Sequence, residues 1–324
     1  MYALAMLFAL LFDAAIGWPD RLFKTIGHPV TWLGRLIARL DAGPNSRDAA
    51  PTVKRLLGIA TLVVVVAVAA LAAGVIQWAL IALALGPVTA MLLGVAAWPL
   101  VAARSLYTHV AAVARPLERG DLDGARAAVA MIVGRDVTAL DAAGVIRASV
   151  ESLSENASDG VVAPLFWGAL LGLPGIAAYK AINTLDSMIG HRTPRHRYFG
   201  WASARVDDVA NLAPARLTGL LIALASGAPA RSMMVMWRDA RKHRSPNAGY
   251  PEAAMAGAIG ARLSGPRTYH DRIADEPWIN AAPPDPSPAD LRRALSVYIR
   301  ALVLGALLLL AGGALLIHGS ALGL

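Results

Sequence analysis

The chain has 324 residues, of which 56% are hydrophobic and only 16% are charged, and its mean hydropathy is +0.53. An average soluble domain is about 45–50% apolar and about 25% charged, so the composition excludes an ordinary soluble enzyme, a disordered chain and a fibrous repeat. The chain has no cysteine, which excludes disulfides, thiolate zinc sites and cysteine nucleophiles. The net charge of +8 does not call for nucleic acid as a partner, because Lys and Arg collect in the cytoplasmic loops of membrane proteins.

The distribution of apolar residues predicts an integral membrane protein. The stretch 56–85 has thirty residues without a charge, and Gln77 is its only strongly polar side chain. A membrane span needs about 20 such residues. The N-terminal stretch is interrupted only by Asp13 and lacks the basic residues of a signal peptide, so we expect it to be retained. The four expected spans are about 1–17, 56–85, 88–103 and 297–318.

Two further apolar stretches, 161–178 and 209–229, contain prolines. Pro164 and Pro174 lie in the first stretch, and Pro214 lies in the second. Broken apolar segments of this kind often enter the membrane without crossing it. We therefore predict an all-α integral membrane protein with about four transmembrane helices, two Pro-broken re-entrant or interfacial segments and helical cytoplasmic loops. We expect it to form a single membrane-embedded catalytic domain, 1–324.

The positions of Lys and Arg predict the orientation of the chain. Neither residue occurs in 1–16, 86–90 or 319–324, and positive charge is retained on the cytoplasmic side. Both termini and the turn at Gly86-Pro87 are therefore expected outside, with 17–55 and 104–296 inside. This pattern predicts a multi-pass protein of the cell inner membrane whose catalytic region, 104–296, faces the cytoplasm.

Local signals in the polar regions predict helices. Asp121 and Asp136 each precede an amphipathic run and resemble helix N-caps. Apolar residues spaced three or four apart from Leu140 predict one helix face ending near Asn156. The proline-rich stretch 281–290 is expected to link this region to the last span.

The first cluster of candidate site residues contains Glu151, Glu155 and Asp159, spaced four apart just before an apolar segment. The first two share a helix face. Carboxylates placed where a helix meets the membrane are plausible oxygen ligands for Mg²⁺. The alternative is an ordinary solvated helix face.

The second cluster, 179–218, combines acids, amides and bases. Asn183 and Asp186 are three residues apart, and Asp207 and Asn211 are four apart. Acids for a metal and bases for phosphates suit phosphoryl chemistry, which depends on positioning and charge stabilisation. The alternative, a basic belt that touches anionic lipid, would explain the arginines of this stretch but not the acid–amide pairs.

The third cluster lies in 238–265, where Lys242, His243, Asn247 and Glu252 surround a turn. The glycines that follow it favour close helix packing. No GxxxxGK[ST] pattern occurs in the sequence, so a nucleotide needs another cradle. Asp13 and His28 form a weaker fourth cluster near the first span.

At these places the sequence strongly resembles the CobD/CbiB family of cobalamin biosynthesis, adenosylcobinamide-phosphate synthase. The matching segments are DAAIGWPDRLFKTIGHPVTWLGRLI, ESLSENASDGVVAPLFWGALLGLPG, YKAINTLDSMIGHRTPRHRYFGWASARVDDVANLAPARLT and RDARKHRSPNAGYPEAAMAGAIGARL. With the spacing of the spans they cover most of the chain, from residue 13 to about 270. Trp18 and His191 depart from the residue types that are common in the family at these positions.

The resemblance implies an ATP- and Mg²⁺-dependent carboxylate–amine ligase. Its substrates would be adenosylcobyric acid and (R)-1-amino-2-propanol or its O-phosphate, and its product adenosylcobinamide or its phosphate. A carboxylate and an amine do not form an amide in water without activation, and an acyl phosphate is the simplest route. Besides membrane lipid, a second copy of the chain and other enzymes of the pathway are candidate partners, whereas nucleic acid is not expected.

The three clusters supply the candidate site residues, and we expect the acids of the first two to converge on one Mg·ATP site. The candidate catalytic residues are Glu151, Glu155, Lys180, Asp207 and His243. The candidate residues for binding ATP are Lys180, Asn183, Arg205, Lys242 and Asn247. The candidate Mg²⁺ ligands are Glu155, Asp159, Asp186, Asp207, Asp208 and Asn211.

Two other classes of protein fit parts of the sequence. A transporter of corrinoids or amines would place ionisable groups at mid-membrane, but the polar clusters here lie outside the uncharged spans 56–85 and 88–103. A noncatalytic relative that acts as a sensor would be expected to lose the acid–amide clusters, and they are intact. Both observations favour the enzyme.

Overall fold

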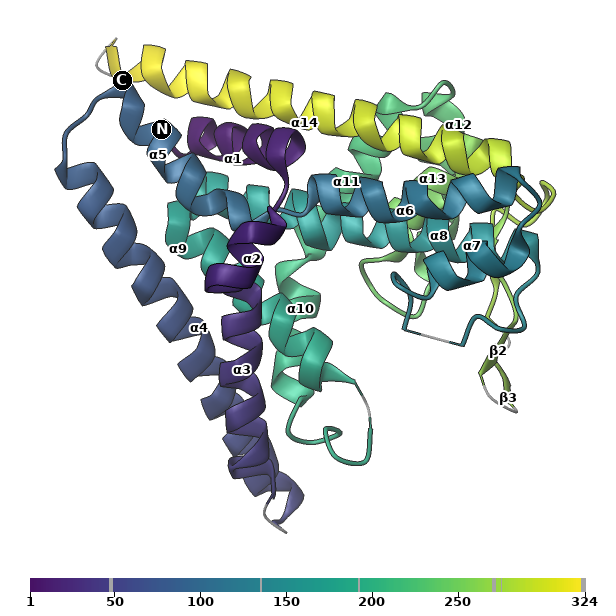
Figure 1. Cartoon of the computed structure of the whole chain (residues 1–324), viewed down its shortest axis with the longest axis horizontal. Helices are drawn as coiled ribbons and strands as arrows, with labels where there is room; N and C mark the ends of the chain where they lie inside the picture. Colours follow the sequence, from purple (N-terminus) through teal and green to yellow (C-terminus); the bar gives the residue numbers. More distant parts are fainter. Residues whose placement is uncertain (47–48, 135, 192, 270–271, 275, 322–324) are drawn as a thin grey trace. The chain divides into compact units, whose positions relative to one another are not determined.

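A computed structural model describes residues 1–46, 49–134, 136–191, 193–269, 272–274 and 276–321. The described residues form helices almost throughout, as predicted (Figure 1). The α-helices are α1 (Tyr2–Ile16), α2 (Asp20–Ile26), α3 (Pro29–Ala42), α4 (Pro51–Ala82), α5 (Pro87–Ala97), α6 (Ala103–Glu118), α7 (Leu122–Val129), α8 (Ala142–Ala157), α9 (Ala163–Leu185), α10 (Trp201–Ala210), α11 (Leu212–Ala225), α12 (Pro229–Asp239), α13 (Gly249–Ile259) and α14 (Pro288–Ala321). Short helical turns are η1 (Pro44–Ser46), η2 (Trp98–Leu100), η3 (Ser158–Val162), η4 (Asp186–Gly190) and η5 (Ala240–Lys242).

The few strands are two or three residues long. β1 (Leu263–Ser264) pairs antiparallel with β4 (Trp278–Ile279), so that Leu263 lies opposite Ile279. β2 (Arg267–Tyr269) pairs antiparallel with β3 (Arg272–Ala274).

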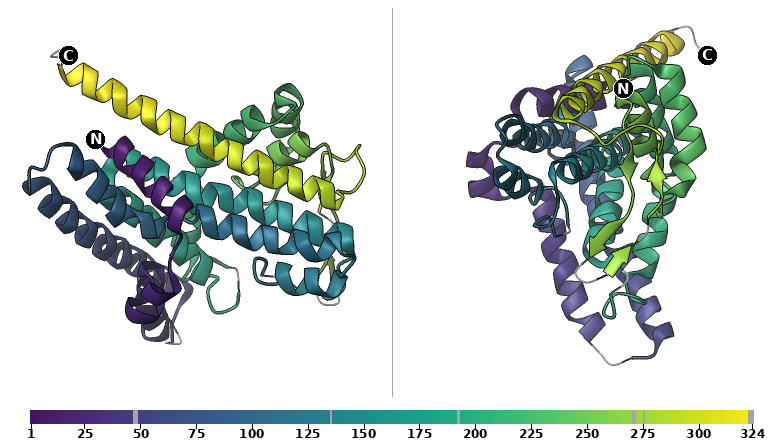
Figure 2. Two further views of the ribbon diagram at one scale, coloured as in Figure 1. Left: turned by 45° about the horizontal axis from the view of Figure 1, so that its top comes forward. Right: turned by 90° about the vertical axis from the view of Figure 1, so that its right-hand side faces the viewer.

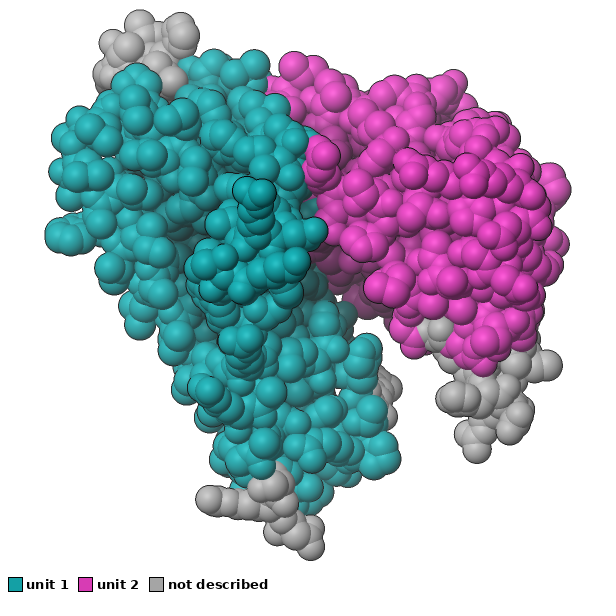
Figure 3. Space-filling view, in the orientation of Figure 1, with its two compact units in different colours: residues 1–102, 163–211, 308–324 teal, residues 103–162, 212–307 magenta. Residues whose placement is uncertain are grey.

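The chain forms two compact units, and each is discontinuous in sequence (Figure 3). Unit 1 contains residues 1–102, 163–211 and 308–324, and unit 2 contains 103–162 and 212–307. The single catalytic domain expected from the sequence stays a prediction, and each unit is described by itself below.

Unit 1 is built on the packing of α4 against α9 and of α1 against α5. Figures 1 and 2 show α1 and α5 side by side. One apolar core joins α3, α4 and the end of α9, and it includes Ile37, Val65 and Phe199, none of which is exposed. This core holds the segment that leads into α10.

A polar contact inside the apolar helices of unit 1 fixes α4 to α9. Helix α9 is broken at Gly172, where φ is +72°, and the side-chain carbonyl of Gln77 accepts a hydrogen bond from the backbone N–H of Leu173 at 2.8 Å. The Gln77 amide donates to the hydroxyl of Tyr2 at 3.1 Å. A Cβ at residue 172 would lie 2.1 Å from Gln77 Oε1, so both the backbone conformation and the close approach require glycine here.

Unit 2 has a larger apolar core in which α13 packs against α11 and α12. Every residue of α13 is buried, and the helix ends at Gly260 in the left-handed conformation with φ +71°. The hydroxyl of Tyr298 on α14 donates to the carbonyl of Ala103 at 3.0 Å, which ties the start of α6 to this unit.

Four helical segments are long and apolar enough to cross a membrane, by length and composition. They are Pro51–Ala82, Pro87–Glu118, Ala142–Gly190 and Pro288–Leu315. These segments contain the expected span 88–103 and most of the expected spans 56–85 and 297–318, and they begin earlier in the sequence. The first expected span, α1, reaches this length only together with α2 and α3, across a bend of 108°.

The broken stretch 161–178 is more continuously helical than expected. Pro164 lies in the first turn of α9, and Pro174 lies in the first turn after the break at Gly172. A proline costs little at residue 174 because the first N–H groups after a break in a helix have no intrahelical partner, whereas Pro164 directly follows the π-helical turn η3. The stretch 209–229 contains α11, and α10 and α11 meet at a bend of 45°.

The helix caps were predicted only in part. Asp121 caps α7, because its Oδ1 accepts from the N–H of Gly124 at 2.8 Å. The prediction for Asp136 was wrong: its side chain closes a turn with Thr138, and Asp141 caps α8 by accepting from the N–H of Gly144 at 2.7 Å. Asp and Thr two residues apart form such a turn without starting a helix. Helix α8 ends at Ala157, close to the expected Asn156.

Candidate functional site

Unit 1 brings most of the second cluster onto consecutive elements. Lys180 and Asn183 are one turn apart near the end of α9, and Asp186 begins η4. Asp207 lies in α10, and Asn211 is the residue at which that helix ends. The acid–amide pairs that the sequence singled out therefore lie at the junction of α9 with η4 and at the end of α10.

Asp207 is the most buried acid of this cluster, with 9% of its surface exposed. Its Oδ2 accepts a hydrogen bond from the Asn211 amide at 3.0 Å, and Asn211 Oδ1 accepts one from the hydroxyl of Tyr179 at 2.9 Å. Its Oδ1 is buried and accepts no hydrogen bond among the described residues. A buried carboxylate oxygen without a donor is costly, so this oxygen is available to a cation.

Further acids lie close to Asp207. Asp186 and Asp208 are near enough to repel its charge, and the amide of Asn183 is near its carboxylate. Gly190 leaves space for Asp186, because a Cβ at residue 190 would lie 1.9 Å from Asp186 Oδ1. Repulsion between like charges favours the entry of a cation.

The turn that carries Asp186 is π-helical, from Asp186 to Gly190. The other acid-bearing turn, η3 in unit 2, is also π-helical and contains Asp159. Short π-helical turns occur frequently at functional sites. The spacing of apolar residues in the sequence does not predict them.

Basic groups border the acids of unit 1. Arg205 donates to Asp208 Oδ2 at 3.0 Å across one turn of α10. Lys180 is half-buried and lies close enough to His28 for their charges to interact. The imidazole Nδ1 of His28 accepts from the N–H of Val30 at 3.2 Å and caps α3, so this residue of the fourth cluster is a neutral ring beside Lys180.

The donor set fits Mg²⁺ held partly by a substrate. Among the described residues, no three His, Asp or Glu side chains come close enough together to hold an ion by themselves. Mg²⁺ commonly binds one or two carboxylates and completes its shell with water and substrate phosphates. Asp207, with its unpartnered oxygen, and Asp186 are the pair that meets this requirement, and the amide oxygen of Asn183 is a further ligand of the right kind.

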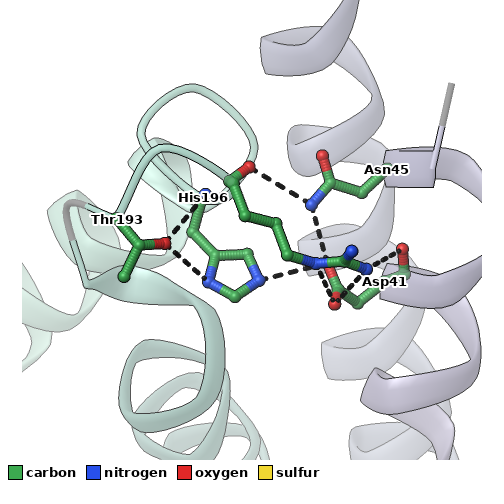
Figure 4. A network of polar contacts seen from close by, with 5 residues as sticks. Asp41, Asn45, Thr193 and His196 are labelled. Carbon is green, nitrogen blue, oxygen red and sulfur yellow. Dashed lines mark hydrogen bonds and ion pairs between the residues drawn. The ribbon is translucent and has the colours of Figure 1, made fainter. Parts of the chain in front are cut away.

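A polar network joins the end of α3 to the segment between η4 and α10 (Figure 4). Arg195 Nε and Nη2 lie 3.0 and 2.8 Å from Asp41 Oδ2, and His196 Nε2 lies 3.3 Å from Asp41 Oδ1. Asn45 donates to Asp41 Oδ1 at 2.7 Å, and Thr193 Oγ1 accepts from the N–H of His196 at 3.2 Å. This network, the Asp41 clamp, holds the segment whose two ends carry Asp186 and Asp207.

The first cluster lies in unit 2, and its three acids have different surroundings. Glu151 is buried, and its Oε1 accepts from the backbone N–H of Ser264 in β1 at 2.8 Å. Glu155 is exposed at the surface, and Asp159 is partly buried in η3. Because this cluster and the second lie in different units, their convergence on one Mg·ATP site stays a prediction.

The third cluster also lies in unit 2, and most of its polar groups are paired with other polar groups of the same unit. His243 Nδ1 accepts from the N–H of Ser245 at 3.0 Å, and Nε2 lies 3.7 Å from Glu252 Oε1. Lys242 Nζ lies 2.8 Å from Asp239 Oδ1, and the Asp239 side chain is completely buried. These contacts stabilise the turn after α12, and the roles of His243 in catalysis and of Lys242 in ATP binding stay predictions.

Asn247 is buried beside an arginine that stacks on a ring. Arg216 donates to Asn247 Oδ1 at 3.2 Å, and its Cζ lies 4.0 Å from the ring centroid of Tyr250. The ring of Trp237 meets that of Tyr250 edge-on, with centroids 5.7 Å apart. A guanidinium held in this way is oriented for a planar or anionic group.

Sequence reasoning missed Tyr179 and Gly190, which support the acids of unit 1. The phenol of Tyr179 reaches Asn211, 32 residues away in the chain, and such a contact has no local pattern. Gly190 could have been noticed, since it lies four residues after Asp186 at the end of a helical stretch.

Comparisons with known proteins agree with the resemblance seen in the sequence. A family model described as CobD/Cbib protein matches residues 6–298. A protein of Rhodobacter capsulatus named "Cobalamin biosynthesis protein CobD" is 58% identical over 302 residues, which cover 93% of this chain and 94% of that protein. Proteins of the same name from a Sinorhizobium species and from Brucella suis are 46% and 47% identical and cover 86% and 84% of this chain and 87% and 85% of their own. No solved structure matches the chain.

Proposed function

Since the chain belongs to the CobD/CbiB family and has a role in cobalamin biosynthesis, we propose that it is an ATP- and Mg²⁺-dependent ligase. It joins the free carboxylate of adenosylcobyric acid to the amine of (R)-1-amino-2-propanol or of its O-phosphate. The observation that carries this proposal is the buried carboxylate of Asp207, whose unpartnered oxygen lies in a cluster with Asp186.

The reaction requires activation of a carboxylate. One carboxylate oxygen of adenosylcobyric acid attacks the γ-phosphorus of ATP, which forms an acyl phosphate and releases ADP. The amine then attacks the acyl carbon, inorganic phosphate leaves, and the nitrogen gives up a proton as the amide forms. Bound Mg²⁺ supplies charge neutralisation of the triphosphate.

The residues of unit 1 divide these tasks. Asp207 and Asp186 hold the ion, while Asn211 and Tyr179 fix the orientation of the Asp207 carboxylate through their hydrogen bonds. Lys180 and Arg205 contact phosphate oxygens, for which charge-assisted hydrogen bonds are well suited. The catalytic roles of Glu151 and Glu155 in unit 2 stay predictions.

The direct test uses the purified full chain with adenosylcobyric acid, ATP, Mg²⁺ and either amine. We expect mass spectrometry to detect the amide and ADP in equal amounts, and omission of Mg²⁺ to stop both. The ratio of the rates with the free and the phosphorylated amine identifies the substrate. ADP release without an amide product, or an amide formed without ATP, would overturn the proposal.

We also propose that the site faces the cytoplasm from the inner membrane. The chain has no cysteine, so single cysteines can report sidedness. A cysteine at Leu85, which is 45% exposed near the turn after α4, is expected to react with an impermeant reagent in intact cells. A cysteine at the exposed Arg119 is expected to react only after lysis, and the reverse pattern would refute this orientation.

A further inference from the structure

Unit 1 carries a group of two arginines and two aromatic rings at the start of α4 and of α10. We call Arg55, Arg197, Tyr198 and Trp201 the Arg55 patch. The Cζ atom of Arg55 lies 5.6 Å from the ring centroid of Tyr198 and 5.7 Å from that of Trp201. The Cζ atom of Arg197 lies 5.5 Å from the same Tyr198 ring, so two guanidinium groups share one aromatic ring.

Tight backbone packing holds the patch together. A Cβ at Gly58, one turn after Arg55, would lie 1.9 Å from the carbonyl oxygen of Phe199. Phe199 follows Tyr198 and is completely buried. Gly200 is equally confined, because a Cβ there would lie 1.6 Å from the carbonyl oxygen of Ile189. The two arginines are therefore carried by backbone that cannot separate without disrupting the core.

Within the part of the chain that the structure describes, no acid matches the charges of these arginines. Neither Arg55 nor Arg197 forms an ion pair or a side-chain hydrogen bond with any residue that the structure describes. Arg195, only two residues before Arg197, is bound through two nitrogens to Asp41 in the Asp41 clamp (Figure 4). The same short segment thus contains Arg195, which is ion-paired, and Arg197, which lies beside the guanidinium of Arg55 without an ion pair among the described residues.

The patch lies where an apolar span begins. The uncharged stretch of α4 starts at Leu56, directly after Arg55, and Leu56 and Val63 are 60% and 59% exposed. Trp201 is 45% exposed. Tyr and Trp side chains concentrate at the level of lipid headgroups, and arginine pairs with phosphate through two parallel hydrogen bonds.

We propose that the Arg55 patch binds the phosphate of an anionic phospholipid headgroup. The exposed apolar side chains that continue along α4 from the patch favour a lipid over a soluble phosphate, because the acyl chains would cover them. Arg55 and Arg197 would share the phosphate, and the exposed ring of Trp201 would contact the headgroup region. This inference does not depend on the ligase reaction.

The test compares lipid binding by delipidated full-length protein in detergent, measured by native mass spectrometry with phosphatidylglycerol and with phosphatidylcholine. We expect the wild-type protein to bind phosphatidylglycerol preferentially and Arg55→Gln/Arg197→Gln to lose this preference, with about a five-fold loss of affinity for each arginine. The control Arg21→Gln/Arg119→Gln removes the same charge from exposed arginines without ring contacts, and its preference is expected to remain.

Further outcomes keep the proposal open to refutation. If the glutamine variants do not fold, Arg55→Lys/Arg197→Lys keeps the charge but loses the planar pairing, and it should bind with intermediate affinity. Equal binding of both lipids by the wild-type protein would overturn the proposal, as would an unchanged preference in the arginine variants. Binding of inorganic phosphate that depends on both arginines, without a preference for phosphatidylglycerol, would identify a soluble phosphate instead and equally overturn it.

Discussion

Asp207 in unit 1 and Asp239 in unit 2 are both buried acids near the end of a helix, with 9% and 0% of their surface exposed. Asp239 is saturated with donors: Arg238 contributes two nitrogens, Lys242 one, and the backbone N–H of Asn280 one at 2.8 Å. Among the described residues, Asp207 has one amide donor at 3.0 Å on Oδ2 and no hydrogen-bond donor on Oδ1. A buried carboxylate whose oxygens all accept hydrogen bonds stabilises the fold. A buried carboxylate that lacks a donor and lies beside like charges destabilises it, and a bound ligand offsets this loss of stability.

The largest expected effect is on turnover in Asp207→Asn. The amide keeps the shape of the side chain but removes the charge that holds Mg²⁺, so we expect turnover to fall on the order of 10²–10³-fold. The free energy of unfolding should remain equal or rise, because repulsion with Asp186 and Asp208 is relieved. Turnover at saturating Mg·ATP and urea unfolding in detergent measure the two quantities. Near-normal turnover would show that Asp207 does not bind the metal.

The matched change in unit 2, Asp239→Asn, should act in the opposite way. It leaves Arg238 and Lys242 without their shared carboxylate, and the loss of a buried charge partner commonly costs about 3–5 kcal/mol. Because Arg238 is half exposed, we expect about 2–3 kcal/mol of unfolding free energy to be lost. Turnover per folded molecule should be unchanged, and a selective loss of turnover would contradict the comparison.

The same acid predicts a dependence of stability on pH. Burial raises the pKa of Asp239, but the hydrogen bonds from Arg238, Lys242 and the N–H of Asn280 outweigh it and lower the pKa from 3.8 to about 2. A lowered carboxyl pKa stabilises the folded state above the unfolded pKa, and this stabilisation is lost as the pH falls from about 4 to about 2. The free energies of unfolding of the wild-type protein and of Asp239→Asn should therefore converge as the pH falls through this interval. A difference that stays constant with pH would refute the assignment.

The smallest expected effect is that of Tyr179→Phe, which removes the hydroxyl that orients Asn211. One hydrogen bond of this kind contributes about 1 kcal/mol, so we expect turnover to fall about five-fold with the apparent affinity for ATP retained. Tyr298→Phe, which removes a hydroxyl that donates to the carbonyl of Ala103 in unit 2, is the matched control. An equal fall in both variants would indicate a general loss of packing.

The sequence predicted those features that depend on local pattern. Most of the uncharged run 56–85 lies in α4, and the acids and amides of 183–211 lie close together because they flank one short segment. Contacts over long distances in the chain were not predictable: the partner of Glu151 is the N–H of Ser264, 113 residues away. The helix cap at Asp141 was missed because Asp136, like Asp141, is an aspartate that precedes an amphipathic run. Which of the two caps α8 depends on the conformation of the turn that Asp136 closes with Thr138.

The contact of Gln77 with the break in α9 has a consequence for biogenesis. The chain is made from its N-terminus, so Gln77 enters the membrane long before Gly172 and Leu173 are synthesised. Until α9 is made, the side-chain carbonyl of Gln77 lacks the N–H of Leu173 as a donor, and this N–H at the break in α9 in turn donates to Gln77. Gln77→Leu should therefore help α4 to insert into the membrane, but it leaves the backbone N–H of Leu173 in α9 without an acceptor in lipid. A substitution that favours the insertion of one helix would thus hinder the packing of α4 against α9.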